Sequence, residues 1–145
     1  MQKILILNGP NLNYLGRRET SIYGKDTLAD IETAGNTLAK TLGIELTWIQ
    51  SNHQGVLIDE IQGANENFDG LIINPAGYGH TSVALRDALL CVEIPIIEVH
   101  LSNPSRREAF RQQSLTADVA LGQICGLGPQ VYQLAIRGMA HQLHH

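Results

Sequence analysis

Short apolar runs that each end in a polar cluster are the feature of this sequence that most constrains its fold. The runs at residues 4–7, 71–73 and 96–97 lead into the clusters NGPN, NPAGYGH and EVHLSN. If the runs are strands of one parallel sheet, their carboxyl ends share an edge, and polar groups that are distant in sequence meet in one crevice. The pattern therefore predicts a catalytic pocket at that edge.

Strand-like and helix-like segments alternate along the whole chain. Apolar residues recur at helical spacing after Thr27, a good N-cap, and stop before Gly43, a good helix terminator. We expect strands at residues 4–7, 44–50, 70–74 and 94–100 and within 117–125, and helices at 27–42, 56–66, 81–91, from Pro104 and at 131–143. This alternation predicts an α/β fold, a flavodoxin-like doubly wound five-stranded parallel sheet in the order 2-1-3-4-5. No linker divides residues 1–145, so we expect a single catalytic domain.

The composition excludes several classes of protein. Apolar residues make up 43% and charged residues 17% of 145 residues, which is ordinary for a globular domain and wrong for a disordered chain. The net charge of -4 argues against nucleic acid as a partner. No apolar run approaches the ~18 residues of a membrane span, and no signal peptide begins the chain, so we expect a cytoplasmic protein that does not bind membranes. Cys91 and Cys125 have apolar neighbours and no metal or redox spacing, and we expect both to be reduced core thiols.

Glu98 and His100 are the first candidates for chemistry. Side chains two apart on a strand share a face, so the carboxylate can orient or charge the imidazole. A structural ion pair is an equally good interpretation of these two residues alone. A metal site needs three convergent ligands, and although His53 and His80 could be recruited, no spaced motif supports one.

The long connection at residues 12–24 is a candidate lid. It carries Arg17, Arg18 and Tyr23. Tyrosine is a poor base at neutral pH, but a neighbouring guanidinium favours the phenolate, so a phenolate base is accessible here. The alternatives are a surface loop without function and a tyrosine that anchors the loop by its ring.

Asn103 and Pro104 suit a helix start after the fourth strand, where backbone N–H groups can bind a carboxylate. Arg107 and Arg111 lie four apart on the expected helix, so one of them can reach a substrate oxygen. The competing interpretation is an exposed salt bridge, which we favour for Arg106 and Arg107.

The expected helix at residues 81–91 is apolar almost all round. One face can be buried within the chain, so the other predicts a subunit interface containing Arg86 and Asp87, unless these two form a structural ion pair. The lysines Lys3, Lys25 and Lys40 do not look buried, which argues against imine chemistry.

Several dispersed motifs resemble type II 3-dehydroquinate dehydratase over nearly the whole chain, from Ile4 to about His141. The motifs are NGPNLNYLG, RRETSIYG, QSNHQG, INPAGYGHTSVALRDAL, IEVHLSNP and the FR at residues 110–111. The resemblance implies a flavodoxin-like, cofactor-free hydro-lyase, usually a homododecamer built from trimers. It implies anti elimination of water from 3-dehydroquinate through an enol(ate) to give 3-dehydroshikimate, in the shikimate pathway of aromatic biosynthesis or in quinate breakdown.

The resemblance also implies roles for individual residues. Tyr23 would be the base that removes the C2 proton, and Arg18 the cation that favours its phenolate. His100, held by Glu98, would be the acid that protonates the departing C1 hydroxyl, and Asn11 would position a water against the enolate. The implied substrate contacts are Asn74, His80, Arg111, the backbone of Leu101 and Ser102, and Asp87, which would reach a neighbouring subunit's site.

Two residues depart from the family pattern. Thr20 stands where proline is common, and Gly79 where threonine is common. We expect both to loosen a loop near the pocket and to affect lid closure more than the chemistry.

A nucleotide-binding or signalling module on the same fold is the competing class. A flavin site calls for a Ser/Thr-rich loop after the first strand, and no Gly-Lys-Ser/Thr motif is present. A phosphoacceptor domain needs aspartates where Asn8 and Asn74 stand. Enolate chemistry on another hydroxylated ring acid is a nearer rival.

Overall fold

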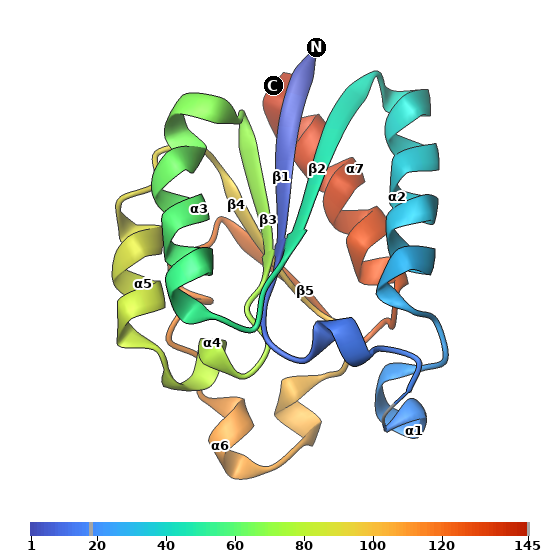
Figure 1. Ribbon diagram of the computed structural model, residues 1–145, viewed down its shortest axis with the longest axis vertical. Helices are drawn as coiled ribbons and strands as arrows, with labels where there is room; N and C mark the ends of the chain where they lie inside the picture. The colour runs from blue at the N-terminus through green and yellow to red at the C-terminus, as the bar shows by residue number, and fades with distance from the viewer. Residues whose placement is uncertain (18, 145) are drawn as a thin grey trace.

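The computed structural model describes residues 1–17 and 19–144. Its centre is a parallel sheet of five strands in the order β2-β1-β3-β4-β5 (Figure 1). The strands are β1 (Gln2–Asn8), β2 (Ile44–Gln50), β3 (Gly70–Asn74), β4 (Ile96–His100) and β5 (Gly122–Cys125). The predicted fold class and strand order are confirmed.

Long helices cover both faces of the sheet. Figure 1 shows α2 (Leu28–Leu42) and α7 (Gln130–His144) on one face and α3 (Gln54–Asn67) and α5 (Val83–Leu90) on the other. Short helical segments gather beyond the carboxyl ends of the strands: η1 (Leu12–Tyr14), α1 (Thr20–Tyr23), α4 (Tyr78–Thr81), η2 (Pro104–Arg106) and α6 (Ala109–Gln112). The functional loops therefore lie at one end of the molecule.

The alternation of side chains along β1 divides the core into two layers. Ile4 and Ile6 pack in the cluster that contains α2 and α7, whereas Leu5 and Leu7 pack in the cluster that contains α3 and α5. All four side chains have no exposed surface. A strand buried on both faces accounts for the continuous apolar run in the sequence.

Local capping chemistry sets the helix boundaries. Thr27 and Asp30 form the reciprocal capping box of α2, and Gly43 ends that helix with a φ of 68°. Ser82 interrupts the predicted helix at 81–91, because its hydroxyl accepts a hydrogen bond from the Leu85 N–H and starts α5 as a separate helix. The chain after Pro104 likewise forms two short helices rather than one.

Both cysteines are free thiols, but the prediction that they are core residues is wrong. Cys91 is exposed, because it follows the end of α5 at the surface, and Cys125 is only half-buried, because β5 is the edge strand. Within the described residues, no helix combines the length and the apolar character that crossing a bilayer requires.

The helix α5 buries one face and leaves apolar side chains outside. Leu85 and Leu89 are buried, whereas Val83 and Leu90 are each 58% exposed. The interpretation of Arg86 and Asp87 as a mutual ion pair is wrong: the Arg86 guanidinium donates to both oxygens of Asp118, at 2.5 and 3.1 Å. The two neighbours in sequence point differently on a helix, and Asp87 is exposed.

Candidate active site

A cavity of about 150 Å³ lies at the carboxyl ends of β1, β3 and β4. This is the edge at which the polar clusters of the sequence were expected to converge. Fifteen residues line it: Pro10, Asn11, Leu12, Leu15, Tyr23, Asn74, Ala76, Gly77, His80, His100, Leu101, Ser102, Pro104, Arg107 and Arg111. Eight of the predicted site residues are therefore brought together, namely Asn11, Tyr23, Asn74, His80, His100, Leu101, Ser102 and Arg111.

The buried phenol of Tyr132 ties together the ends of β1 and β3 beneath the cavity. Its hydroxyl donates to Asn8 Oδ1 at 2.5 Å and accepts from Asn74 Nδ2 at 3.0 Å. The other end of the Asn74 amide accepts the N–H of Ala76 at 3.1 Å. Burial raises the pKa of Tyr132 well above its ordinary value, so this phenol stays protonated and serves as a fixed strut.

Backbone geometry shapes the rim of the cavity. Asn11 and Ala76 both have a left-handed conformation, with φ of 69° and 51°. Asn11 is held there because its N–H donates to Asn52 Oδ1 at 2.9 Å. Such conformations are costly for residues other than glycine and concentrate at functional sites. Gly9 is also required, because a Cβ there would stand 2.6 Å from the Pro75 carbonyl oxygen.

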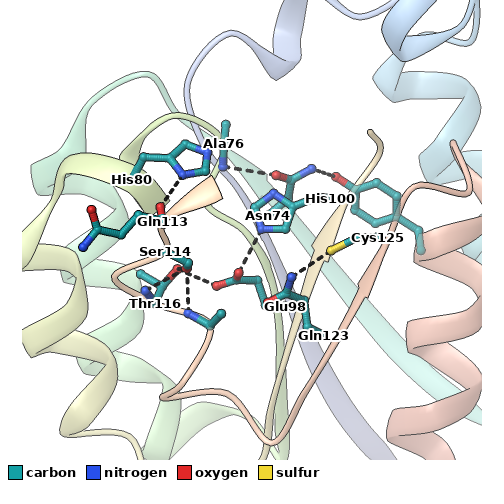
Figure 2. A network of polar contacts seen from close by, with 12 residues as sticks. Asn74, Ala76, His80, Glu98, His100, Gln113, Ser114, Thr116, Gln123 and Cys125 are labelled. Carbon is teal, nitrogen blue, oxygen red and sulfur yellow. Dashed lines mark hydrogen bonds and ion pairs between the residues drawn. The ribbon is translucent and has the colours of Figure 1, made fainter. Parts of the chain in front are cut away.

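A carboxylate lies behind the imidazole of His100. Nε2 of His100 is 2.8 Å from Oε2 of Glu98, whose side chain is completely buried (Figure 2). The other oxygen, Oε1, accepts the hydroxyl of Thr116 at 2.5 Å. An ionised carboxylate only accepts hydrogen bonds, so this contact requires a hydrogen on Nε2 when Glu98 is ionised. The predicted pairing of Glu98 with His100 is confirmed as a contact.

His80 lies on the same side of the cavity. Its Nδ1 is 2.8 Å from the Gln113 carbonyl oxygen, which fixes the ring, and its centroid is 6.4 Å from that of His100 in a stacked arrangement (Figure 2). The described residues contain no cluster of three His, Cys, Asp or Glu side chains suited to a metal ion.

Arg107 lines the cavity, although the sequence analysis favoured an exposed salt bridge for it. Its Nη1 donates to the Tyr23 hydroxyl at 2.6 Å, and its guanidinium lies 5.2 Å from the centre of that ring. The side chain is only 12% exposed, so the surface position expected for it is wrong. The cause is the break after η2, which turns Arg107 inward and separates it from the helix of Arg111. Arg18, the cation expected to serve Tyr23, lies outside the described residues.

Three further predicted positions differ in their surroundings. Arg111 lines the cavity, and its Nε donates to Glu108 Oε2 at 2.6 Å; this partner holds the pKa of Glu108 below its ordinary value. Ser102 accepts a long hydrogen bond of 3.4 Å from Arg107. Asp87 lies on α5 outside this cavity.

The arrangement supplies two groups that can exchange protons. A phenol in contact with a guanidinium comes from α1, and an imidazole backed by a carboxylate comes from β4. A cation beside a phenol favours the phenolate, and an anion beside an imidazole favours the imidazolium. The cavity can therefore hold a base and an acid at the same time.

Comparison with known proteins identifies the family. The family model described as dehydroquinase class II matches residues 2–140. The chain belongs to this family. It is 55% identical over 136 residues to the 3-dehydroquinate dehydratase of Bacillus licheniformis, and the match covers 94% of each chain. It is 53% identical over 141 residues to that of a Chelativorans species, covering 97% of each.

Solved dehydroquinase structures have the same fold. The type II dehydroquinase of Butyrivibrio crossotus matches with a TM-score of 0.93 at 48% identity, covering 95% of this chain and 97% of that one. The enzyme from Propionibacterium acnes matches with a TM-score of 0.94 at 38% identity, covering 97% of both chains. The whole of the dehydroquinase fold is thus present here, and the cavity lies within it.

Proposed function

We propose that this protein is a 3-dehydroquinate dehydratase, a cofactor-free hydro-lyase of the shikimate pathway that converts 3-dehydroquinate to 3-dehydroshikimate. Membership of the class II dehydroquinase family over nearly the full chain carries this conclusion. The convergence of Tyr23 and His100 on one cavity supports it independently.

The proposed reaction is an anti elimination that begins with Tyr23. Its phenolate takes the proton from C2, and the electron pair of the C–H bond moves into the neighbouring ketone to form an enolate. Arg107, at 2.6 Å from the phenol oxygen, stabilises the phenolate, and Arg18 is proposed to share this role. Asn11 at the rim is proposed to position a water that donates to the enolate oxygen.

The second step uses His100 as the acid. The enolate collapses to the conjugated enone, the C1–O bond breaks, and the imidazolium gives its proton to the departing hydroxyl, which leaves as water. Glu98 stabilises the imidazolium through the 2.8 Å contact with Nε2. The phenol and the neutral imidazole then exchange protons with water, which restores the starting state.

The remaining cavity residues are proposed to hold the substrate. Arg111 is the cation for a substrate oxygen, and the backbone at Leu101 and Ser102 is proposed to bind the carboxylate. His80 and Asn74 are proposed to meet the ring hydroxyls. Both are already held by the protein, through Gln113 and Tyr132, so they bind without reorganising.

No lysine is placed for imine chemistry. Lys3, Lys25 and Lys40, which are the only lysines of the sequence, are all exposed and lie outside the cavity. An enolate mechanism therefore fits the side chains that line the site.

The assembly is proposed to be a homododecamer in which Asp87 reaches a neighbouring subunit's site. The exposed apolar residues Val83 and Leu90 flank Asp87 on α5 and support an interface there. The cytoplasm is proposed as the location, because both cysteines are free thiols.

The test follows the absorbance of the conjugated enone formed from 3-dehydroquinate. We expect turnover in EDTA and after borohydride treatment with substrate, because neither a metal nor an imine takes part. Tyr23→Phe and His100→Ala should fold normally and lose about 10²–10⁴-fold in kcat. Tyr14→Phe is the control, because Tyr14 is half-exposed and lies outside the cavity. Near-normal dehydration by either site variant would refute its role.

A further inference from the structure

The carboxylate of Glu98 is the most deeply buried charge-bearing group near the cavity. The residue has no exposed surface, and its two oxygens have different partners: Oε2 meets His100 and Oε1 meets Thr116. An ionised carboxylate without such partners is very unfavourable in a protein interior. The hydroxyl of Thr116 is thus the counterpart of the imidazole on the other side of the same group, as Figure 2 shows.

Thr116 is completely buried and is held firmly by the loop between α6 and β5. The Ser114 hydroxyl accepts the N–H groups of Thr116 and Ala117 at 3.2 and 2.9 Å. The N–H of Leu115 donates to the Gly79 carbonyl at 2.8 Å, which ties the loop to α4. These contacts fix the position of Thr116, so its hydroxyl is preorganised to donate to the Glu98 carboxylate.

Gly79 provides the space that this contact needs. A Cβ on Gly79 would lie 3.3 Å from Thr116 Oγ1 and 2.9 Å from the Pro75 ring. A larger residue would push against the hydroxyl. The absence of a side chain at position 79 therefore leaves room for the Thr116–Glu98 hydrogen bond behind His100.

The hydrogen bond from Thr116 decides where a shared proton resides. The Glu98–His100 pair with one proton to share exists either as carboxylate and imidazolium or as carboxylic acid and neutral imidazole. A hydroxyl donating to the carboxylate stabilises the first arrangement more than the second, because a hydrogen bond to a charged oxygen is stronger than one to the neutral acid. Only the first contains the imidazolium, and a neutral imidazole is a far weaker acid.

We propose that Thr116 is a positioning residue of the dehydratase: its hydroxyl keeps Glu98 ionised and so keeps His100 in the protonated form that acts as the acid. The inference rests on the proposed function. Thr116 does not touch the cavity, so it acts on the rate of the chemical step and not on substrate binding.

The first experiment compares Thr116→Val, which keeps the shape but loses the donor, with Thr116→Ser, which keeps the donor. Thr116→Val should lower kcat by about 10- to 100-fold, the size of a hydrogen bond to a charged group, and leave KM unchanged, while Thr116→Ser stays near wild type. Thr41→Val is the matched control, since its hydroxyl donates to the Leu38 carbonyl within α2, away from the cavity. A merely structural role would lower stability without separating kcat from KM.

The second experiment is a double-mutant cycle with Glu98→Gln. If Thr116 acts through the carboxylate, Thr116→Val has no further effect on kcat once residue 98 is an amide. An equal loss in both backgrounds would overturn the inference.

Nitrogen-15 chemical shifts of the His100 ring report its protonation state in the wild-type enzyme, so this measurement needs no variant. The wild-type enzyme at the pH of full activity should show an imidazolium with both ring nitrogens protonated. A neutral ring there would overturn the inference while leaving dehydration intact. If wild-type enzyme instead fails to dehydrate 3-dehydroquinate, the proposed function itself is wrong.

Discussion

Arg107 joins two segments that are distant in the chain. It lies just beyond η2, yet its guanidinium contacts the phenol of Tyr23 in α1, 84 positions away in sequence. The same side chain lies 3.4 Å from Ser102 at the exit of β4. One planar, multiply donating group thus positions the proposed base against the wall of the cavity.

Replacing this group tests its dual role. Arg107→Lys keeps the positive charge but loses the planar fork, so it should hold Tyr23 less well and reduce kcat/KM by about tenfold or more. Steady-state kinetics with 3-dehydroquinate provide the measurement. Arg106→Lys, at an exposed position of η2, should behave like wild type. Equal kinetics for the two variants would show that Arg107 does not position the base.

Among the elements, β5 is the edge strand that lies next to the strand of His100. It pairs with β4 on one side only, placing Cys125 beside His100 in register. The Gln123 amide donates to the Cys125 sulfur at 2.9 Å. Partial burial, with the nearby charge of Glu98 adding to it, raises the pKa of the Cys125 thiol.

The two thiols should therefore react with iodoacetamide at different rates. Since a raised pKa means less thiolate at neutral pH, Cys125 should be alkylated slowly there and faster only as the pH rises beyond the ordinary thiol value of 9.0. The exposed Cys91 should be modified first. Peptide mass spectrometry across a pH series measures both rates, and faster labelling of Cys125 at neutral pH would contradict the expectation.

The elements were predictable where the signal is local. Thr27 and Gly43 predict the two ends of α2, and the apolar run at residues 70–74 predicts β3. The break at Ser82 was not predictable, since the residues on both sides continue the helical pattern and one serine hydroxyl decides the matter.

The residues of the candidate site were likewise predictable only where the signal is local or follows from the sheet topology. Polar residues at strand ends, such as His100 and Asn74, follow from the topology of a parallel sheet. The inward turn of Arg107 and the contact of Thr116 with Glu98 depend on loops that fold back over 84 and 18 positions, and no periodicity encodes them. Arg107 was instead assigned to the surface, where most arginines lie.

At the scale of the whole molecule, two exposed leucines share one groove beside α5. Leu90 and Leu121 are 58% and 61% exposed and line the same groove beside the amino ends of β4 and β5. Single exposed apolar side chains are normal on a protein surface, but neighbouring ones in a shared groove form a patch that a partner surface can cover. This observation supports the proposed assembly.

A charge placed in this groove should break the assembly. Leu90→Arg is expected to reduce the mass measured by light scattering, because the buried charge would lack a partner. Leu134→Arg on α7, where the native side chain is 40% exposed, serves as the control. An unchanged mass for Leu90→Arg would place the subunit contacts elsewhere.

The strut formed by Tyr132 makes the ends of β1 and β3 depend on α7. Its phenol, carried by that helix, contacts both Asn8 and Asn74. A chain in which α7 has not yet packed against the sheet lacks the group that aligns the two asparagines. We therefore expect a competent site only in molecules whose α7 has docked on the sheet.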